Sequence, residues 1–274
     1  MRSTDHTVVL AALLLLVSVL MPVTAFAETL DQRTARLVPH LIVTRPEGDG
    51  PFPVVFMLHG CGGQRPFQDG MAEVALRAGA AVVQIDSFAP RRIGRAAAIA
   101  FVCTGMRLHG RERAGDLYAA MSWARTQSWA DPARFGSVGW SHGAWTIMDA
   151  LALRRDEIER ATGLSGLGDE PLQGLAGTLL VYPYTSIASY AGRRDWRFAP
   201  HRNVAIVAER DYIVGPTRGT LERQRARGTP MEIIVFEGAT HAFEDDRAED
   251  PRVRYDPAAT AREHELLREM IAAL

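Results

Sequence analysis

The sequence alternates continuous apolar runs with segments of helical spacing, and this alternation limits the possible folds more than any other feature. Residues 53–59 (PVVFMLH) and 80–86 (AAVVQID) are apolar without interruption, as in strands that are covered on both faces. Between them, residues 69–79 carry apolar side chains at helical spacing and end in Gly79. The pattern predicts a mostly parallel sheet with helices on both faces.

The same alternation continues to the end of the chain. Further strands are predicted at residues 134–140, 178–184, 203–209 and 231–237. Further helices are predicted at residues 113–128, 144–155 and 258–274. No internal repeat, Pro/Ser-rich linker or charge block divides the chain, so we expect residues 28–274 to form a single α/β domain. The connections 87–110 and 185–202 are long enough to cover a pocket.

Residues 1–27 have the layout of a signal peptide. Arg2 precedes an uncharged run whose apolar centre, residues 8–20, is shorter than the roughly 20 residues that a transmembrane helix needs. Small residues favour cleavage after Ala27, and cleavage after Ala25 is an alternative. We therefore expect an exported protein, periplasmic or secreted, without a stable membrane anchor.

Composition excludes several classes of function. All 31 basic residues are arginine, and without lysine there is neither Schiff-base chemistry nor a phosphate-binding loop ending in Gly-Lys-Ser/Thr. A net charge of −1 gives no reason to expect a nucleic acid partner. Two cysteines are too few for a four-cysteine zinc site or an iron–sulfur cluster, and no metal site is predicted. In an oxidising compartment Cys61 and Cys103 form a disulfide or remain two separate buried thiols.

The motif that carries chemistry is Gly-Trp-Ser-His-Gly at residues 139–143, a G-x-S-x-G pattern between a predicted strand and a predicted helix. In that context a sharp turn lifts the hydroxyl of Ser141 above the sheet. Side chains at positions 139 and 143 would collide with neighbouring backbone, and glycine avoids these collisions because it has no side chain. The context favours a nucleophilic serine over an ordinary tight turn.

A serine nucleophile needs a histidine base, which a carboxylate must orient. On this type of sheet the chain order is serine, acid, histidine. Asp211 and His241 fit, because each directly follows a predicted strand at the end where open α/β sheets bind ligands. The rival acids are Glu209, Asp195, Asp245 and Asp246. Asp211 is preferred because Glu209 lies within its strand and residues 245 and 246 crowd the histidine's own loop.

An acyl-transfer site also needs N–H donors for the oxyanion of the tetrahedral intermediate. The backbone N–H of His142 follows the nucleophile directly and is one expected donor. The second is expected from the glycine-rich loop after the early strand, residues 59–63, where we assign the backbone N–H of Cys61.

Aromatic and arginine side chains gather near the second long connection. They are Tyr184, Tyr190, Trp196, Phe198, Arg193, Arg194 and Arg197. We assign Tyr184, Trp196 and Arg193 to a substrate pocket with a cation for a carboxylate. The alternative is ordinary loop packing, because arginine is the only basic residue type that the chain uses apart from histidine.

Taken together, these residues resemble the dienelactone hydrolase family of α/β-hydrolases. The resemblance lies in residues 53–63 (PVVFMLHGCGG), 86–88 (DSF), 139–143, Asp211 and the loop at 238–243. It implies an α/β-hydrolase fold without a large lid domain, hydrolysis of an ester or lactone without a cofactor, and Ser141, Asp211 and His241 as the catalytic triad. The dienelactone-cleaving members carry a cysteine nucleophile, so this chain resembles the serine branch and dienelactone itself is not the expected substrate.

The sequence therefore predicts an exported serine hydrolase that cleaves a carboxylic ester or lactone through an acyl-enzyme on Ser141. One alternative is a peptidase or thioesterase with the same triad. Another is an inactive scaffold that binds a ligand or a partner.

Overall fold

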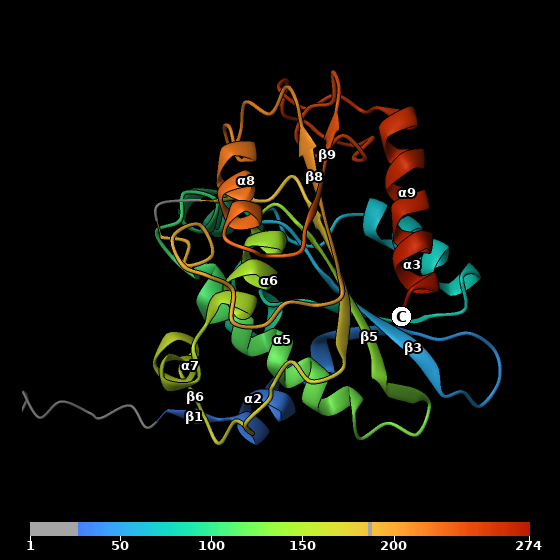
Figure 1. Cartoon of the computed structure of the whole chain (residues 1–274), viewed down its shortest axis with the longest axis vertical. Coiled ribbons are helices and arrows are strands. Elements are labelled where there is room, and N and C mark those ends of the chain that lie inside the picture. The colour runs from blue at the N-terminus through green and yellow to red at the C-terminus, as the bar shows by residue number, and fades with distance from the viewer. Residues whose placement is uncertain (1–26, 186–187) are drawn as a thin grey trace, which may run out of the picture.

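A mostly parallel sheet organises the computed structural model, which describes residues 27–185 and 188–274 (Figure 1). In order across the sheet, its seven strands are β2 (Leu41–Thr44), β4 (Ala81–Ile85), β3 (Phe52–Leu58), β5 (Ala130–Trp140), β7 (Leu175–Val181), β8 (Arg202–Ala208) and β9 (Glu232–Phe236). Strand β2 is antiparallel to β4, and the other neighbours are parallel. The predicted sheet type is confirmed.

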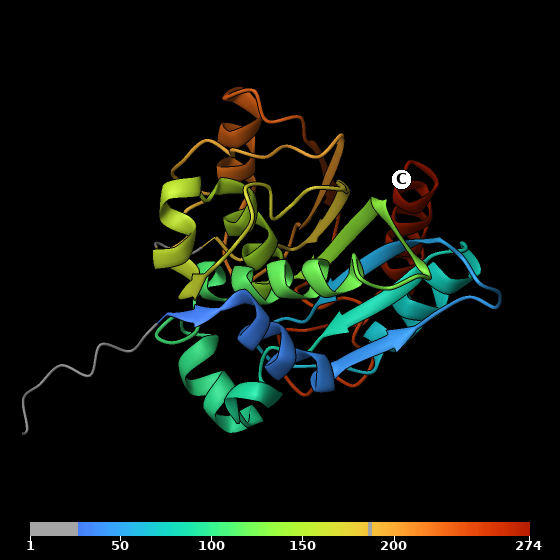
Figure 2. The same ribbon diagram turned by 90° about the horizontal axis from the view of Figure 1, so that it is seen from below.

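Helices cover both faces of the sheet, as Figure 2 shows from below. Helices α3 (Phe67–Arg77) and α9 (Pro257–Ala272) pack on one face. The other face is covered by α2 (Leu30–Leu37), α5 (Gly110–Ala124), α6 (His142–Ala152), α7 (Arg155–Thr162) and α8 (Arg218–Ala226).

Two separate cores explain why strand β3 is apolar along its whole length. Along β3, Phe56 belongs to the core under α5 and α6, and its neighbour Met57 belongs to the core under α3 and α9. Successive strand side chains point to opposite faces, so a strand covered on both sides has few polar positions, and Gln84 in β4 and Ser137 in β5 are buried exceptions.

The predicted strands and helices form at the expected places, with ends that differ by a few residues. The structure adds elements that the pattern did not indicate: α2, α7, α8, strand β2 and a short parallel pair, β1 (Glu28–Thr29) with β6 (Leu164–Ser165). Helix α8 is mostly polar, so its apolar spacing is weak. Helix α2 begins with a capping box in which Thr29 and Gln32 bond each other's backbone, a signal that the sequence does contain.

A covalent bond joins the first long connection to the loop after β3. This connection folds as η2 (Ala89–Arg91), α4 (Arg95–Ala97) and η3 (Ala98–Val102), which pack around a small apolar cluster of their own. Cys103, directly after η3, forms a disulfide with Cys61, and their Cα atoms are 5.0 Å apart. Of the two alternatives for these cysteines, the disulfide is confirmed.

No helix in the described ranges combines the length and the apolar character needed to cross a membrane.

Replacing both cysteines with alanine should destabilise the protein strongly. The disulfide closes a loop with a sequence separation of 42. For a loop of this size, the lost restriction of the unfolded chain corresponds to about 4 kcal/mol of unfolding free energy. Urea unfolding of the C61A/C103A variant and of the wild type, with and without reductant, measures the difference. A double variant within about 1 kcal/mol of the oxidised wild type would contradict this account.

Candidate active site

Ser141 occupies a strained backbone position between β5 and α6. Its φ of 52° and ψ of −109° lie outside the common regions for a residue with a side chain. The position is held by backbone hydrogen bonds: the Ser141 N–H donates to the Val181 carbonyl at 2.9 Å, and its carbonyl accepts from Trp145 N–H at 3.0 Å. The sharp turn predicted from the G-x-S-x-G pattern is present.

The two flanking glycines are required by direct steric contact. A Cβ atom on Gly139 would lie 2.5 Å from the carbonyl carbon of Gly143. A Cβ atom on Gly143 would overlap with the carbonyl group of Leu58 in strand β3. Helix α6 therefore begins in close contact with the carboxyl end of the neighbouring strand, which only glycine allows.

His241 and Asp211 come together beyond the carboxyl ends of β8 and β9. The Nδ1 atom of His241 lies 2.7 Å from Oδ2 of Asp211, and both side chains are almost fully buried. The other oxygen of Asp211 accepts hydrogen bonds from the backbone N–H groups of Ile213, at 2.9 Å, and Val214, at 3.0 Å. These bonds fix the orientation of the carboxylate. Because Asp211 binds Nδ1 of the imidazole, Nε2 is not involved in this contact.

Of the four rival acids, Asp246 is exposed and the other three have other partners. Glu209 accepts a hydrogen bond from the backbone N–H of Gly238 at 2.8 Å. Asp245 forms an ion pair with Arg65 at 2.8 Å, and Asp195 lies 4.0 Å from Arg227. These contacts leave Asp211 as the carboxylate bonded to His241 in the described part of the chain.

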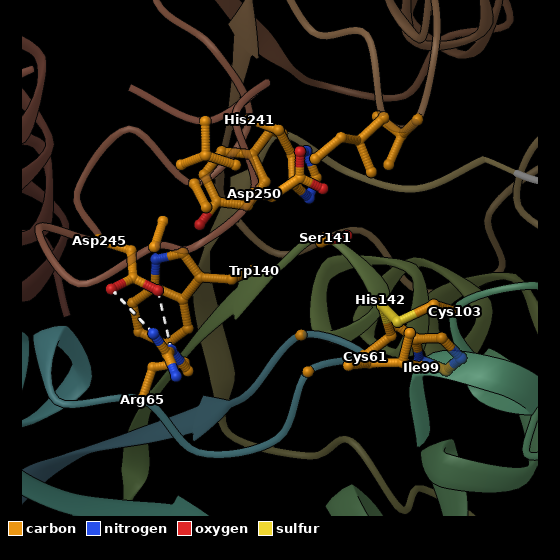
Figure 3. Close-up of a pocket in the computed structure, with 18 of the residues that line it drawn as sticks. Cys61, Arg65, Ile99, Cys103, Trp140, Ser141, His142, His241, Asp245 and Asp250 are labelled. Atoms are coloured by element: carbon orange, nitrogen blue, oxygen red, sulfur yellow. Dashed lines mark hydrogen bonds and ion pairs between the residues drawn. A yellow bond between two sulfur atoms is a disulfide. The ribbon is translucent and has the colours of Figure 1, made fainter. Parts of the chain in front are cut away.

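Ser141 and His241 line the same cavity, which has a volume of about 460 Å³ (Figure 3). One wall carries the Cys61–Cys103 disulfide and Ile99. The ion pair between Arg65 and Asp245 lies on the other side of Ser141. Other lining residues are Gly60, Gly62, Gly63, Phe67, Arg95, Trp140, His142, Tyr182, Tyr184, Ile213, Val214, Ala242, Ala248, Glu249, Asp250, Arg252 and Val253. Both residues assigned as oxyanion donors, Cys61 and His142, are among those that line this cavity.

The assignment of the substrate pocket needs correction. Tyr184 lines the cavity, but Trp196 is buried in the core under α6 and Arg193 is exposed, so neither reaches it. Asp149 of α6 explains the difference. Its carboxylate accepts hydrogen bonds from the backbone N–H groups of Tyr190 and Ala191, at 2.8 and 3.0 Å, and so holds this segment against the helix.

A buried acidic group beneath His241 was not expected from the sequence. The ring of Tyr182 lies 4.5 Å from the His241 ring, and its hydroxyl donates to Glu244. Nearby, Nε1 of Trp140 donates to Glu263 at 2.8 Å. Burial raises the pKa of Glu263 to about 8 and that of Glu244 well above its usual range, and each has one carboxyl oxygen without a hydrogen-bond partner among the described residues.

One signal for this group is present in the sequence. Glu263 occupies the same helical stripe as the buried Leu266, Leu267 and Met270, so a charged residue type stands on an apolar face. Glu244 and Tyr182 give no comparable signal, because each becomes buried through the loops that surround His241.

Comparison with known proteins places these observations in a family. Residues 40–274 match the sequence model of the dienelactone hydrolase family. The chain belongs to that family. Its predicted α/β-hydrolase fold is thus confirmed, and so is the resemblance noted from the sequence.

Solved structures agree on the fold. Thermogutta terrifontis esterase 2 phosphorylated by paraoxon is 17% identical, with a TM-score of 0.62 over 85% of this chain and 87% of that one. The butyrate-bound form of the same esterase gives 16% identity and a TM-score of 0.60, over 85% and 88% of the two chains. The dienelactone hydrolase-like promiscuous phosphotriesterase P91, from metagenomic libraries, is 18% identical, with a TM-score of 0.62 over 85% and 91%.

Replacing Glu263 with glutamine should stabilise the protein at alkaline pH. A carboxyl whose pKa rises from 4.5 to about 8 on folding stays protonated in the folded state while it ionises in the unfolded state. Between these two values, stability therefore falls as pH rises. Because one pKa unit corresponds to about 1.4 kcal/mol, a rise of this size predicts that E263Q gains on the order of a few kcal/mol at pH 8 and nothing at pH 4.

Urea unfolding of both proteins from pH 4 to pH 8 measures this difference. The matched control is E265Q on the same helix, where the side chain is half exposed and pairs with Arg262. E265Q should follow the wild type across the range. A difference between E263Q and the wild type that does not grow with pH would rule out the buried-acid explanation.

Proposed function

We propose that this protein is an exported serine hydrolase that cleaves a carboxylic ester or lactone through an acyl-enzyme on Ser141. One observation carries the proposal: Ser141, on its strained turn, shares a cavity with His241, and His241 is bonded to the buried carboxylate of Asp211 at 2.7 Å. Family membership supports hydrolysis as the reaction class.

The proposed mechanism follows from these contacts. The Nδ1–H of His241 donates to Asp211, which leaves Nε2 as the base that takes the proton of the Ser141 hydroxyl. Serine then attacks the ester carbonyl, and the resulting oxyanion accepts hydrogen bonds from the backbone N–H groups of Cys61 and His142. The protonated His241 gives its proton to the leaving alcohol. Water, activated by the same base, releases the acid.

The cavity supports a small-molecule substrate. Its volume of about 460 Å³ falls in the usual range for such sites, and apolar side chains such as Phe67, Ile99 and Val214 form part of its lining. The related T. terrifontis esterase 2 was captured with butyrate. A short-chain ester is therefore the first substrate to test.

Labelling with a fluorophosphonate probe tests the nucleophile. The mature protein should gain a single adduct, and S141A should gain none and lose about 10⁴-fold or more of kcat on p-nitrophenyl butyrate. Ser137, a buried serine within strand β5, provides the matched control, and S137A should label as the wild type does. An unlabelled wild type, or a labelled and active S141A, would contradict the assignment of Ser141.

A set of butyryl substrates that differ in the leaving group separates the proposal from its rivals. Amide and thioester analogues of the same acyl group should be cleaved more slowly than the oxygen ester. A preference for either analogue would favour the peptidase or thioesterase alternative, and a folded protein that cleaves none would favour a ligand-binding scaffold.

Export can be tested by expressing the full chain in a bacterium and sequencing the N-terminus of the product. We expect cleavage after Ala27, so that the exported protein begins at Glu28 in strand β1. Replacing Ala25 and Ala27 with leucine should block cleavage, because signal peptidase needs small residues there. An intact N-terminus on cell-retained wild-type protein would contradict the proposal.

A further inference from the structure

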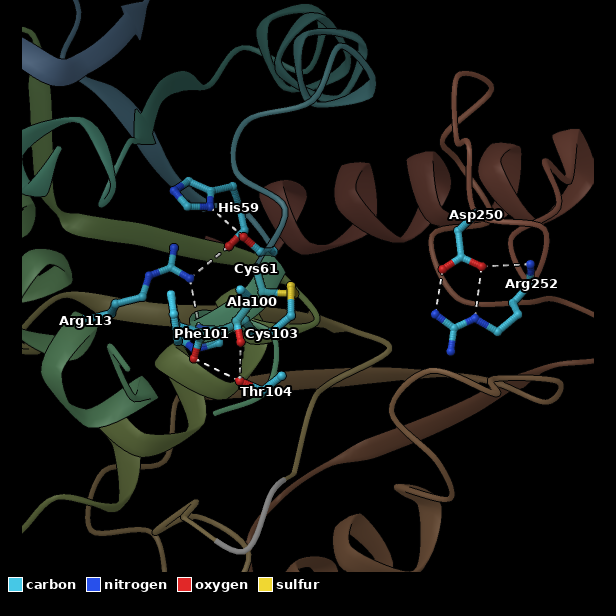
Figure 4. Close-up of a disulfide and its surroundings, with 11 residues drawn as sticks. His59, Cys61, Ala100, Phe101, Cys103, Thr104, Arg113, Asp250 and Arg252 are labelled. Carbon is cyan, nitrogen blue, oxygen red and sulfur yellow. Dashed lines mark hydrogen bonds and ion pairs between the residues drawn. A yellow bond between two sulfur atoms is a disulfide. The ribbon is translucent and has the colours of Figure 1, made fainter. Parts of the chain in front are cut away.

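Arg113, on helix α5, is a fully buried cation directly behind the proposed oxyanion site. Its Nη1 lies 3.0 Å from the carbonyl oxygen of His59 and 3.0 Å from Nδ1 of His142. The two hydrogens of one guanidinium nitrogen thus reach two separate segments. Figure 4 shows the first of these contacts beside the Cys61–Cys103 disulfide.

These two segments are the ones that carry the proposed oxyanion donors. The His59 carbonyl stands just before Gly60 and Cys61, so a bond to it fixes the start of the glycine-rich loop. His142 follows the nucleophile, and its ring accepts from Arg113 through Nδ1. Arg113 therefore links the two segments that carry the backbone N–H groups of Cys61 and His142.

The positive charge of Arg113 is not neutralised by direct contact. Among the described residues it forms no ion pair, and its Nε and Nη2 atoms have no hydrogen-bond partner. Asp116, about one turn further along the same helix, attracts this charge through space but is itself bound by Arg33 and Arg91 at 2.8 Å each. Burial lowers the pKa of Arg113 to about 10, so the group remains charged at neutral pH.

The imidazoles around Arg113 are neutral, so they do not share its charge. Burial and the neighbouring guanidinium lower the pKa of His59 to about 3 and that of His142 well below its usual range. His59 is held by its own contacts: Nδ1 donates to the Gly60 carbonyl at 2.7 Å, and Nε2 accepts from the Ser87 N–H at 3.3 Å.

Burying a charge without an ion-pair partner costs free energy of folding. The position of such a charge therefore suggests a role in function. A negative charge that develops nearby during the reaction is stabilised strongly, because the surroundings have a low dielectric constant and the cation is already fixed. We propose that Arg113 is a positioning residue of the hydrolase, which orients the two oxyanion donors and stabilises the oxyanion with its buried charge. This inference rests on the proposed function.

The experiment compares charge with hydrogen bonding at this position. R113Q keeps an amide donor for the His59 carbonyl and removes the charge, whereas R113K keeps the charge and loses the planar fork. Loss of one direct oxyanion donor costs about 10²–10³ in kcat, so R113Q should lose roughly 10- to 100-fold with KM within about twofold. R113K should recover most of this loss.

Two further measurements exclude a merely structural role. A trifluoromethyl ketone of the same acyl chain, whose serine adduct carries an oxyanion, should bind R113Q more weakly by the same factor as the loss in kcat. The corresponding trifluoromethyl alcohol, which has no carbonyl for Ser141 to attack and so forms no oxyanion, should bind both proteins equally. The matched control is R33Q, because Arg33 is also buried and binds Asp116 but contacts neither donor segment.

We expect R33Q to lower thermal stability while kcat and the ketone affinity stay within about threefold of the wild type. The inference is overturned if folded R113Q keeps wild-type kcat, if R33Q loses as much kcat, or if R113K is as impaired as R113Q. Should R113Q fail to fold, R113K decides: a folded R113K with a kcat reduced a hundredfold overturns the role of the charge. A wild type without esterase activity or probe labelling would instead refute the proposed function, and this inference with it.

Discussion

The close contact between Gly143 and the carbonyl of Leu58 determines where the nucleophile stands. Because no side chain separates the start of α6 from the end of β3, the turn at Ser141 is pressed against the neighbouring strand. The same approach brings the loop that follows β3, including Cys61, to the cavity that Ser141 lines. A strained backbone at one residue is compensated by packing across two central strands.

Around this turn, buried polar groups are concentrated on both sides of the sheet. Arg113 and Asp116 lie on α5, whereas Glu263 lies on α9 and Glu244 is bonded to Tyr182. Each group costs free energy to bury. Arg113 contacts His142, Glu244 contacts Tyr182 and Glu263 contacts Trp140, and these three partners line the cavity. The interior near the candidate site is therefore specified by hydrogen bonds, while the remaining core depends on apolar packing.

The sequence predicted the parts of the molecule that depend on local pattern. Apolar runs indicated the sheet, and the position of Asp211 and His241 after successive strands anticipated their contact. The prediction that Trp196 lines the substrate pocket was wrong. No local pattern reveals that the carboxylate of Asp149 binds the backbone of Tyr190 and Ala191 and so holds this segment against α6.

The buried charges were missed for a related reason. Helix α5 is buried along most of its length, so its sequence shows little difference between its faces. The sequence alone therefore does not distinguish Arg113 from an exposed arginine. Glu263 could have been recognised as a charged residue within an apolar stripe. Long-range contacts decide such positions, and a single sequence does not contain them.

The two sides of the cavity are held by bonds of different kinds. On one side, the Cys61–Cys103 disulfide encloses strand β4 within a covalent loop and fixes residue 103 to the glycine-rich loop after β3. On the other side, the ion pair of Arg65 with Asp245 is a noncovalent contact, which can break without chemistry. A bulky acyl chain would therefore gain room by displacing the segment after His241, and the mouth of the cavity would widen in one direction only.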